Sequence, residues 1–187
     1  MSLMSASRSS AGFQGIAAGS AIVAGLAWVA KDVGSRISPD PDYWDCNSAY
    51  DYALNAVDTL AFLSLGLALL GLHKLFRDTI GHKRAGIGVV AAAGFGVAGV
   101  ANLLEHCAGL GALGFAYVIG LTLGLLLLFV FGLALTRTPI PTWCTGLLLI
   151  GTAAGILRAE QGGMIVFGCS WVLFGLVLFR PLRLSEI

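Results

Sequence analysis

Six long apolar stretches divide the chain, and they constrain its fold more than any other feature of the sequence. A helix needs about 20 predominantly apolar residues to cross a bilayer. The stretches lie at residues 12–30, 53–73, 85–107, 109–135, 142–158 and 163–180, and no connection between them is long enough to form a separate domain. The sequence therefore predicts an all-α fold: a polytopic membrane helix bundle with six transmembrane helices, in which residues 1–187 form a single transmembrane domain.

The composition agrees with an integral membrane protein. Hydrophobic residues make up 57% of the chain, charged residues make up 11%, and the mean hydropathy is +0.88. A soluble domain carries about 25% charged residues. These values exclude a disordered chain and a protein that binds nucleic acid through a basic surface. The first apolar stretch has no small-residue cleavage site after it, so we expect a retained span and not a signal peptide.

The charges on the connections predict the orientation in the membrane. With six spans, both termini lie on one side, which holds eight basic residues: Arg8, Lys74, Arg77, Lys83, Arg84, Arg137, Arg180 and Arg183. The other side holds three, which are Lys31, Arg36 and Arg158. Basic residues concentrate in cytoplasmic connections, so we expect both termini to be cytoplasmic. The compactness of the chain favours a multi-pass protein of the plasma membrane, specifically a bacterial inner membrane.

Polar residues gather where the second and third spans reach the non-cytoplasmic side. Residues spaced i, i+4 and i+7, or i, i+3 and i+4, share one face of a helix. A short connection joins these two spans, so we expect antiparallel neighbours whose polar faces meet. The residue at the turn between the fifth and sixth spans is expected at the same level. This hypothetical outer binding cluster comprises Asp51, Asn55, Asp58, Asn102, Glu105, His106 and Arg158.

Two interpretations of this cluster stay open at the level of sequence. In the first, the cluster is a structural polar network, since Ser48 and Asp51 have the spacing of a capping box. Glu105, at the end of its helix, then needs a partner such as Arg158 or Asn55, or a proton. In the second, the cluster is a site, because ionisable residues inside a span are costly and often functional. Such a site would support cation coordination, proton relay, general acid–base chemistry or the binding of a polar ligand head group.

The cysteines and histidines bear on covalent links and cofactors. Cys46 and Cys107 both fall on the outer side, where an oxidising environment permits a disulfide between them, although the sequence alone does not decide whether the bond forms. His73 and His82 lie at the inner edge and His106 at the outer edge, which argues against a haem or zinc site built from histidines. The aspartates of residues 40–45 lack the spacing and glycine of a calcium loop. The sequence predicts no metal site and identifies no cofactor.

Small residues at helical spacing predict close helix packing. The pairs Gly15/Gly19, Gly120/Gly124 and Gly151/Gly155 fit the small-xxx-small pattern, which lets helix backbones approach within a membrane. Besides the lipid bilayer, such glycine-rich faces suit a partner membrane protein or a second copy of the chain.

The sequence contains no recognisable catalytic motif, and this favours a non-catalytic accessory, regulatory or assembly component over an enzyme. Two alternatives remain. One is a small channel or carrier for protons, cations or a small solute that uses Asp58 and Glu105. The other is an intramembrane lipid-modifying enzyme with Glu105 and His106 as an acid–base pair and Asp58 as the group that orients them.

Overall fold

Six helices form the computed structural model, which describes residues 3–37 and 46–180. The helices are α1 (Leu3–Ile37), α2 (Ala49–Ile80), α3 (His82–Ala108), α4 (Gly114–Leu135), α5 (Thr142–Arg158) and α6 (Gly163–Leu178). Two short 3-10 turns, η1 (Gly111–Leu113) and η2 (Ala159–Gln161), precede α4 and α6. Within these two ranges the chain forms no strand.

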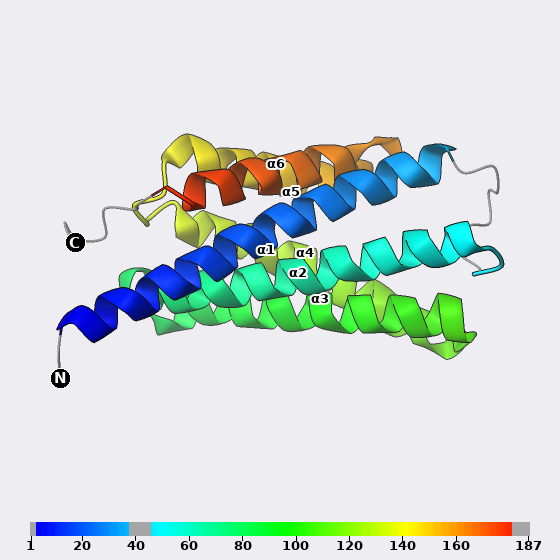
Figure 1. Cartoon of the computed structure of the whole chain (residues 1–187), viewed down its shortest axis with the longest axis horizontal. Coiled ribbons are helices and arrows are strands. Elements are labelled where there is room, and N and C mark those ends of the chain that lie inside the picture. The colour runs from blue at the N-terminus through cyan, green and yellow to red at the C-terminus, as the bar shows by residue number, and fades with distance from the viewer. Residues whose placement is uncertain (1–2, 38–45, 181–187) are drawn as a thin grey trace.

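The helices run along one common long direction and form a bundle (Figure 1). Each helix packs against its neighbour in the sequence, and α6 returns to pack against α1, although the contact between α4 and α5 is thinner than the others. The first and last helices are also joined by hydrogen bonds. Nε2 of Gln14 donates to the backbone oxygens of Leu178 at 2.6 Å and Arg180 at 2.8 Å. The described beginning and end of the chain therefore lie at the same end of the bundle.

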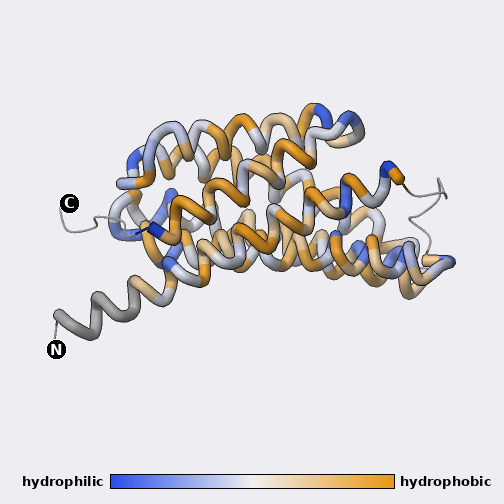
Figure 2. The backbone as a smooth tube through the Cα atoms, turned by 45° about the horizontal axis from the view of Figure 1, so that its top comes forward, coloured by the Kyte–Doolittle hydropathy of each residue, from blue (hydrophilic) through white to orange (hydrophobic). Residues whose placement is uncertain are grey.

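The bundle has the length and surface of a membrane protein. Four segments are long and apolar enough to cross a membrane, namely Ala11–Ile37, Ala49–Ile80, His82–Ala108 and Gly111–Leu135. The apolar helices α5 and α6 are shorter, at 17 and 16 residues. Figure 2 shows hydrophilic residues gathered toward the two ends, with hydrophobic residues along the length between them. The predicted helical membrane bundle is confirmed.

Some helices extend beyond the predicted spans, and one begins later than predicted. The first helix continues past residue 30 to Ile37 and the second continues past residue 73 to Ile80. Hydropathy marks the apolar part of a helix, whereas polar residues such as Lys31 and Arg77 continue the same backbone hydrogen bonding. The predicted span at 109–135 begins too early. Gly109 ends α3 in the left-handed conformation (φ 70°), which favours glycine, and η1 follows before α4 starts at Gly114.

Close glycine contacts hold neighbouring helices together inside the chain. A Cβ atom added to Gly168 of α6 would lie 2.5 Å from the backbone oxygen of Gly25 on α1. One added to Gly120 of α4 would lie 2.7 Å from the oxygen of Gly94 on α3. The pair Gly151/Gly155 similarly faces α6, whereas Gly15 and Gly19 of α1 face open space. Two of the three predicted glycine motifs therefore pack helices within the bundle.

An aromatic cluster fills the middle of the bundle. The ring of Phe62 on α2 lies 4.9 Å from that of Trp28 on α1, 6.3 Å from Phe95 on α3 and 5.9 Å from Tyr117 on α4. Toward the end that carries the α2–α3 connection at Gly81, the core is mainly apolar, and its buried side chains include Leu72, Phe76, Leu128, Phe131, Leu135, Phe174 and Leu178. The buried hydroxyl of Thr145 at this end bonds within its own helix, to the backbone oxygen of Thr142. We call this the basic end, for its exposed Lys83 and Arg84, and the opposite one the disulfide end.

Candidate functional site

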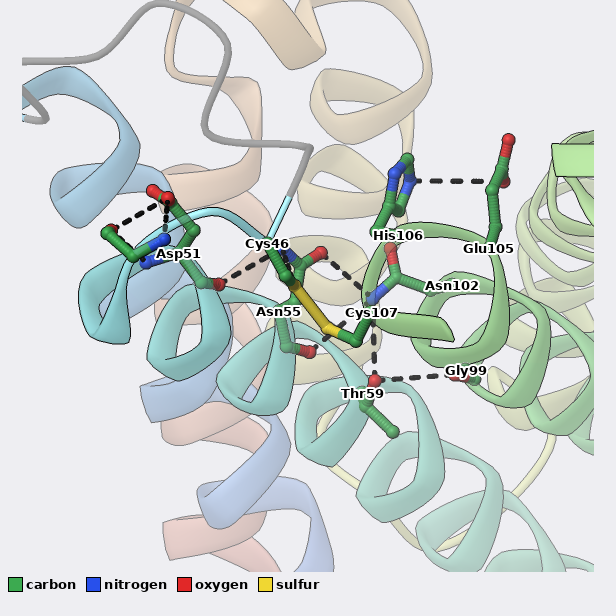
Figure 3. The surroundings of a disulfide bond; sticks show 10 residues. Cys46, Asp51, Asn55, Thr59, Gly99, Asn102, Glu105, His106 and Cys107 are labelled. Carbon is green, nitrogen blue, oxygen red and sulfur yellow. Dashed lines mark hydrogen bonds and ion pairs between the residues drawn. A yellow bond between two sulfur atoms is a disulfide. The ribbon is translucent and has the colours of Figure 1, made fainter. Parts of the chain in front are cut away.

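A disulfide bond between Cys46 and Cys107 lies at the disulfide end (Figure 3). It joins the residue three positions before α2 to the last turn of α3, across 61 positions of sequence and with the Cα atoms 5.1 Å apart. Two polar contacts reinforce the connection. The backbone nitrogen of Cys46 donates to the oxygen of His106 at 3.4 Å, and Nδ2 of Asn55 contacts the Cys46 sulfur at 3.5 Å. The start of α2 is thus fixed to the end of α3.

Asp51 forms the capping box that the sequence predicts. Its carboxylate oxygen Oδ2 accepts from the backbone nitrogen of Ser48 at 2.9 Å and from the Ser48 hydroxyl at 2.7 Å. The same hydroxyl oxygen accepts from the Asp51 backbone nitrogen at 3.2 Å. These bonds satisfy backbone donors that a helix start leaves unpaired, and a carboxylate there also suits the helix dipole. The predicted capping box is confirmed, and it gives Asp51 a structural role.

Asn55 and Asn102 join α2 to α3 beside the disulfide (Figure 3). Nδ2 of Asn102 lies 3.5 Å from Oδ1 of Asn55 and 3.4 Å from Oγ1 of Thr59. Thr59 in turn donates to the backbone oxygen of Gly99 at 3.3 Å. Thr59 is absent from the predicted cluster, although its position four residues after Asn55 places it on the same helix face. Polar contacts of this kind hold helices together in membranes.

Asp58 is the residue of the predicted cluster that lacks an obvious structural role. It lies one turn deeper than Asn55, its side chain is 1% exposed, and neither carboxylate oxygen has a hydrogen-bond partner in the described part of the chain. Lys31 on α1 is the charged group that acts on it electrostatically. A buried carboxylate without hydrogen bonds is costly. Hydrogen bonding within the described bundle therefore does not account for the burial of Asp58.

Glu105 and His106 lie on the other side of α3, against α4. Oε2 of Glu105 is 3.8 Å from Nε2 of His106, an ion pair when the imidazole is protonated. The ring of Tyr117 lies edge-on to His106 with the ring centres 6.5 Å apart. Together with Gly114 and Val118 these side chains line an open pocket of about 390 Å³. The pocket offers an acid, a base and a phenol near the surface, which is enough for proton transfer or for binding a polar head group.

Arg158 is separate from the rest of the predicted cluster. Its side chain is exposed at the turn between α5 and α6, where Nη1 donates to Oε1 of Gln161 at 2.5 Å. Among the described residues, no hydrogen bond or ion pair joins Arg158 to Glu105, whose ionic partner is His106. Nor does one join Asp58 to Glu105 or His106. The structure therefore divides the cluster into a capping box, an α2–α3 network, a buried Asp58 and a surface pocket.

The acidic stretch at residues 40–45 lies outside the described residues. Comparisons of the chain with protein-family models, with curated proteins and with solved structures find no match.

Proposed function

We propose that this protein is a non-catalytic accessory or assembly component of a membrane, and that it associates with a partner membrane protein through a groove on α3 and α4. The observation that carries the proposal is the groove itself. It is an apolar hollow of about 480 Å³, lined by Ala93, Gly96, Val97, Val100, Ala101, Leu104, Leu113 and Ala116. A Cβ atom added to Gly96 would contact nothing within 4 Å.

Small residues support this assignment because membrane helices associate through close backbone approach. Alanine and glycine account for four of the residues that line the groove (Ala93, Gly96, Ala101 and Ala116), whereas the lipid-facing side of α2 carries the large residues Leu60, Leu63, Leu67 and Leu70. A partner helix that lies between α3 and α4 can pack more closely against these small residues than lipid acyl chains can. The polar residues of the cluster support a structural reading, because Asp51, Asn55 and Asn102 bond to groups within the bundle.

The closed core near the basic end also favours this proposal over a channel. The buried side chains there are mainly apolar and aromatic, and the buried hydroxyls of Thr145, Thr152 and Ser170 bond to backbone oxygens of their own helices. Among the described residues, the buried ionisable side chains of the disulfide end therefore do not continue toward the basic end. We further propose that all six helices cross the plasma membrane of a bacterium with the basic end in the cytoplasm. At 1.5 Å per residue α5 and α6 are about 25 Å long, and the bilayer thins locally to match short spans at modest cost.

The test is native mass spectrometry of the full chain purified from its membrane in mild detergent. We expect a stoichiometric partner chain that is lost in Gly96→Leu, because leucine fills the groove. The matched control is Gly146→Leu, since Gly146 also faces open space but lies on α5 away from the groove. A lone monomer, or equal loss of the partner in both variants, would contradict the proposal. A homo-oligomer lost only in Gly96→Leu would replace the partner protein by a second copy.

A second candidate function is a small carrier of protons or cations, and the buried carboxylate of Asp58, which has no hydrogen bond among the described residues, favours it. Such a carrier would open its apolar core to complete a path. In proteoliposomes, this function predicts a proton or cation flux that is lost in Asp58→Asn and Glu105→Gln. Asp78→Asn is the control, because Asp78 is an exposed acid near the basic end. Equal flux in wild type and Asp58→Asn, or none above empty liposomes, would exclude the carrier.

A further inference from the structure

A second apolar groove lies near the basic end, on the side of the bundle where α1, α2 and α3 meet. It has a volume of about 400 Å³ and is lined by Phe13, Ile16, Leu67, Leu70, Gly71, His73, Lys74 and Val89. The proposed function does not use it, since the partner groove lies on α3 and α4. It differs from that groove in chemistry, because an ammonium and an imidazole stand among its apolar lining residues.

We propose that this groove binds one anionic phospholipid of the leaflet at the basic end, with an acyl chain along α2 and the phosphate at Lys74. Leu67, Leu70 and Lys74 are spaced i, i+3 and i+7, so they follow one face of α2. Leu67 is 50% exposed and Leu70 43% exposed, and Lys74 is exposed. The apolar strip suits an acyl chain, and the single cation at its end suits the negative head group of the same lipid.

The position of Lys74 along α2 fits the depth of a lipid phosphate. Lys74 lies six residues before the end of α2 at Ile80, or about 9 Å along the axis. A lysine this close to a helix end extends its flexible side chain toward the head-group level. From Lys74 to Leu67 the groove then follows the helix for about 10 Å toward the midplane, which is the direction an acyl chain takes.

His73 fixes one wall of the groove. Its Nδ1 donates to the backbone oxygen of Ala85 on α3 at 3.0 Å, since a carbonyl oxygen only accepts. This bond holds the imidazole between α2 and α3 beside Lys74. On the other wall, the backbone of Gly71 lies against Ala17 of α1, where a Cβ atom would come within 2.9 Å of the Ala17 Cβ. The groove is thus bounded by two close helix contacts.

The charge of this end selects an anionic head group over a zwitterionic one. Besides Lys74, the described residues near it include Arg77, Lys83 and Arg84, whereas Asp78 is the acid that pairs with Arg77 at 3.6 Å and with His82 at 3.9 Å. Basic residues beside a membrane surface attract anionic lipids in general. Lys74 alone among these four cations lines the groove. A specific contact between the lipid phosphate and Lys74 can therefore be distinguished from the general attraction of anionic lipids to the basic end.

The test titrates phosphatidylglycerol and phosphatidylcholine into the purified, delipidated full chain and measures bound lipid by native mass spectrometry. We expect one tight phosphatidylglycerol, with phosphatidylcholine at least about tenfold weaker. Lys74→Glu should weaken the tight phosphatidylglycerol by about tenfold or more, whereas the matched charge reversal Lys83→Glu should change it less than about twofold. Leu67→Trp keeps every charge and should also remove the tight lipid, because the indole occupies the path of the chain.

Three results would overturn the proposal. Equal losses in Lys74→Glu and Lys83→Glu would mean general electrostatic attraction without a site. Equal affinities for the two lipids would mean an apolar groove with no head-group selectivity. Unchanged binding in Leu67→Trp would place the lipid elsewhere. If Lys74→Glu does not fold, Lys74→Gln against Lys83→Gln answers the same question through loss of the charge alone.

Discussion

At the scale of single residues, two carboxylates on the same face of α2 have opposite relations to the fold. Asp51 and Asp58 are each 1% exposed and lie two helical turns apart. The Asp51 carboxylate accepts two hydrogen bonds from Ser48 in the capping box, and the Asp51 backbone nitrogen donates a third to the Ser48 hydroxyl. Asp58 has no hydrogen bond within the described residues. The sequence spacing places both residues on one face of the helix. Only their hydrogen bonds in the folded structure distinguish a helix cap at Asp51 from an unbonded carboxylate at Asp58.

This difference predicts opposite effects of the same substitution. Asp58→Leu should raise the free energy of unfolding by about 1 kcal/mol or more, because it removes a buried polar group that has no hydrogen bond. Asp51→Leu should lower the same quantity by about 1 kcal/mol, because it removes a helix cap. Equilibrium unfolding in mixed micelles of dodecyl sulfate measures both. If Asp58→Leu destabilises the protein as much as Asp51→Leu does, Asp58 has a structural partner and is no candidate site.

The contact between Asn102 and Thr59 is predicted to couple α2 to α3. A double-mutant cycle of Asn102→Ala and Thr59→Val should give an interaction free energy of about 0.5–1.5 kcal/mol, the range found for polar contacts between membrane helices. Thr152→Val is the control partner for Asn102→Ala, since its hydroxyl bonds to Leu148 within α5. Its coupling to Asn102 should be zero within error. A coupling as small for Thr59 would mean that the contact between Asn102 and Thr59 does not join α2 to α3.

At the scale of whole helices, hydropathy and spacing predicted the existence of all six elements but not their ends. The bounds of α5 agree with the predicted 142–158, because Pro141 directly precedes the helix and its apolar run fills it. The ends of α1 and α2 extend beyond the apolar runs, because backbone hydrogen bonding continues through polar residues. The sequence also could not tell which glycines face a neighbouring helix, since that depends on how each helix is rotated in the bundle.

The glycine contacts give a prediction at this scale. Gly168→Ala should destabilise the bundle by about 1–3 kcal/mol, because the new methyl group would lie 2.5 Å from the Gly25 oxygen and force α6 away from α1. Gly146→Ala should be neutral or stabilising by up to about 1 kcal/mol, because alanine favours a helix and the site is open. The same unfolding assay ranks the two variants. Equal effects would show that α1 and α6 do not pack closely in the membrane.

At the scale of the whole molecule, the two ends of the bundle carry different chemical groups. One end carries a disulfide, which persists in an oxidising compartment, and the other carries Lys83, Arg84 and Arg137. The bundle between them is apolar outside and closed near the basic end. Disulfide position and positive charge are independent indicators of sidedness, and both support our proposal that the disulfide end lies outside the cytoplasm. Their agreement allows the orientation and the number of crossings to be tested together.

Single cysteines should therefore label in an alternating pattern. With Cys144 and Cys169 replaced by alanine and the disulfide retained, a membrane-impermeant maleimide on intact cells should label Tyr52→Cys and Gln161→Cys. Lys83→Cys and Arg137→Cys should label only after the membrane is permeabilised, which also controls for their reactivity. Gln161 lies between α5 and α6, so its exposure tests whether these two short helices cross. Labelling of Gln161→Cys only after permeabilisation would show that they do not, and a fully reversed pattern would place the disulfide in the cytoplasm.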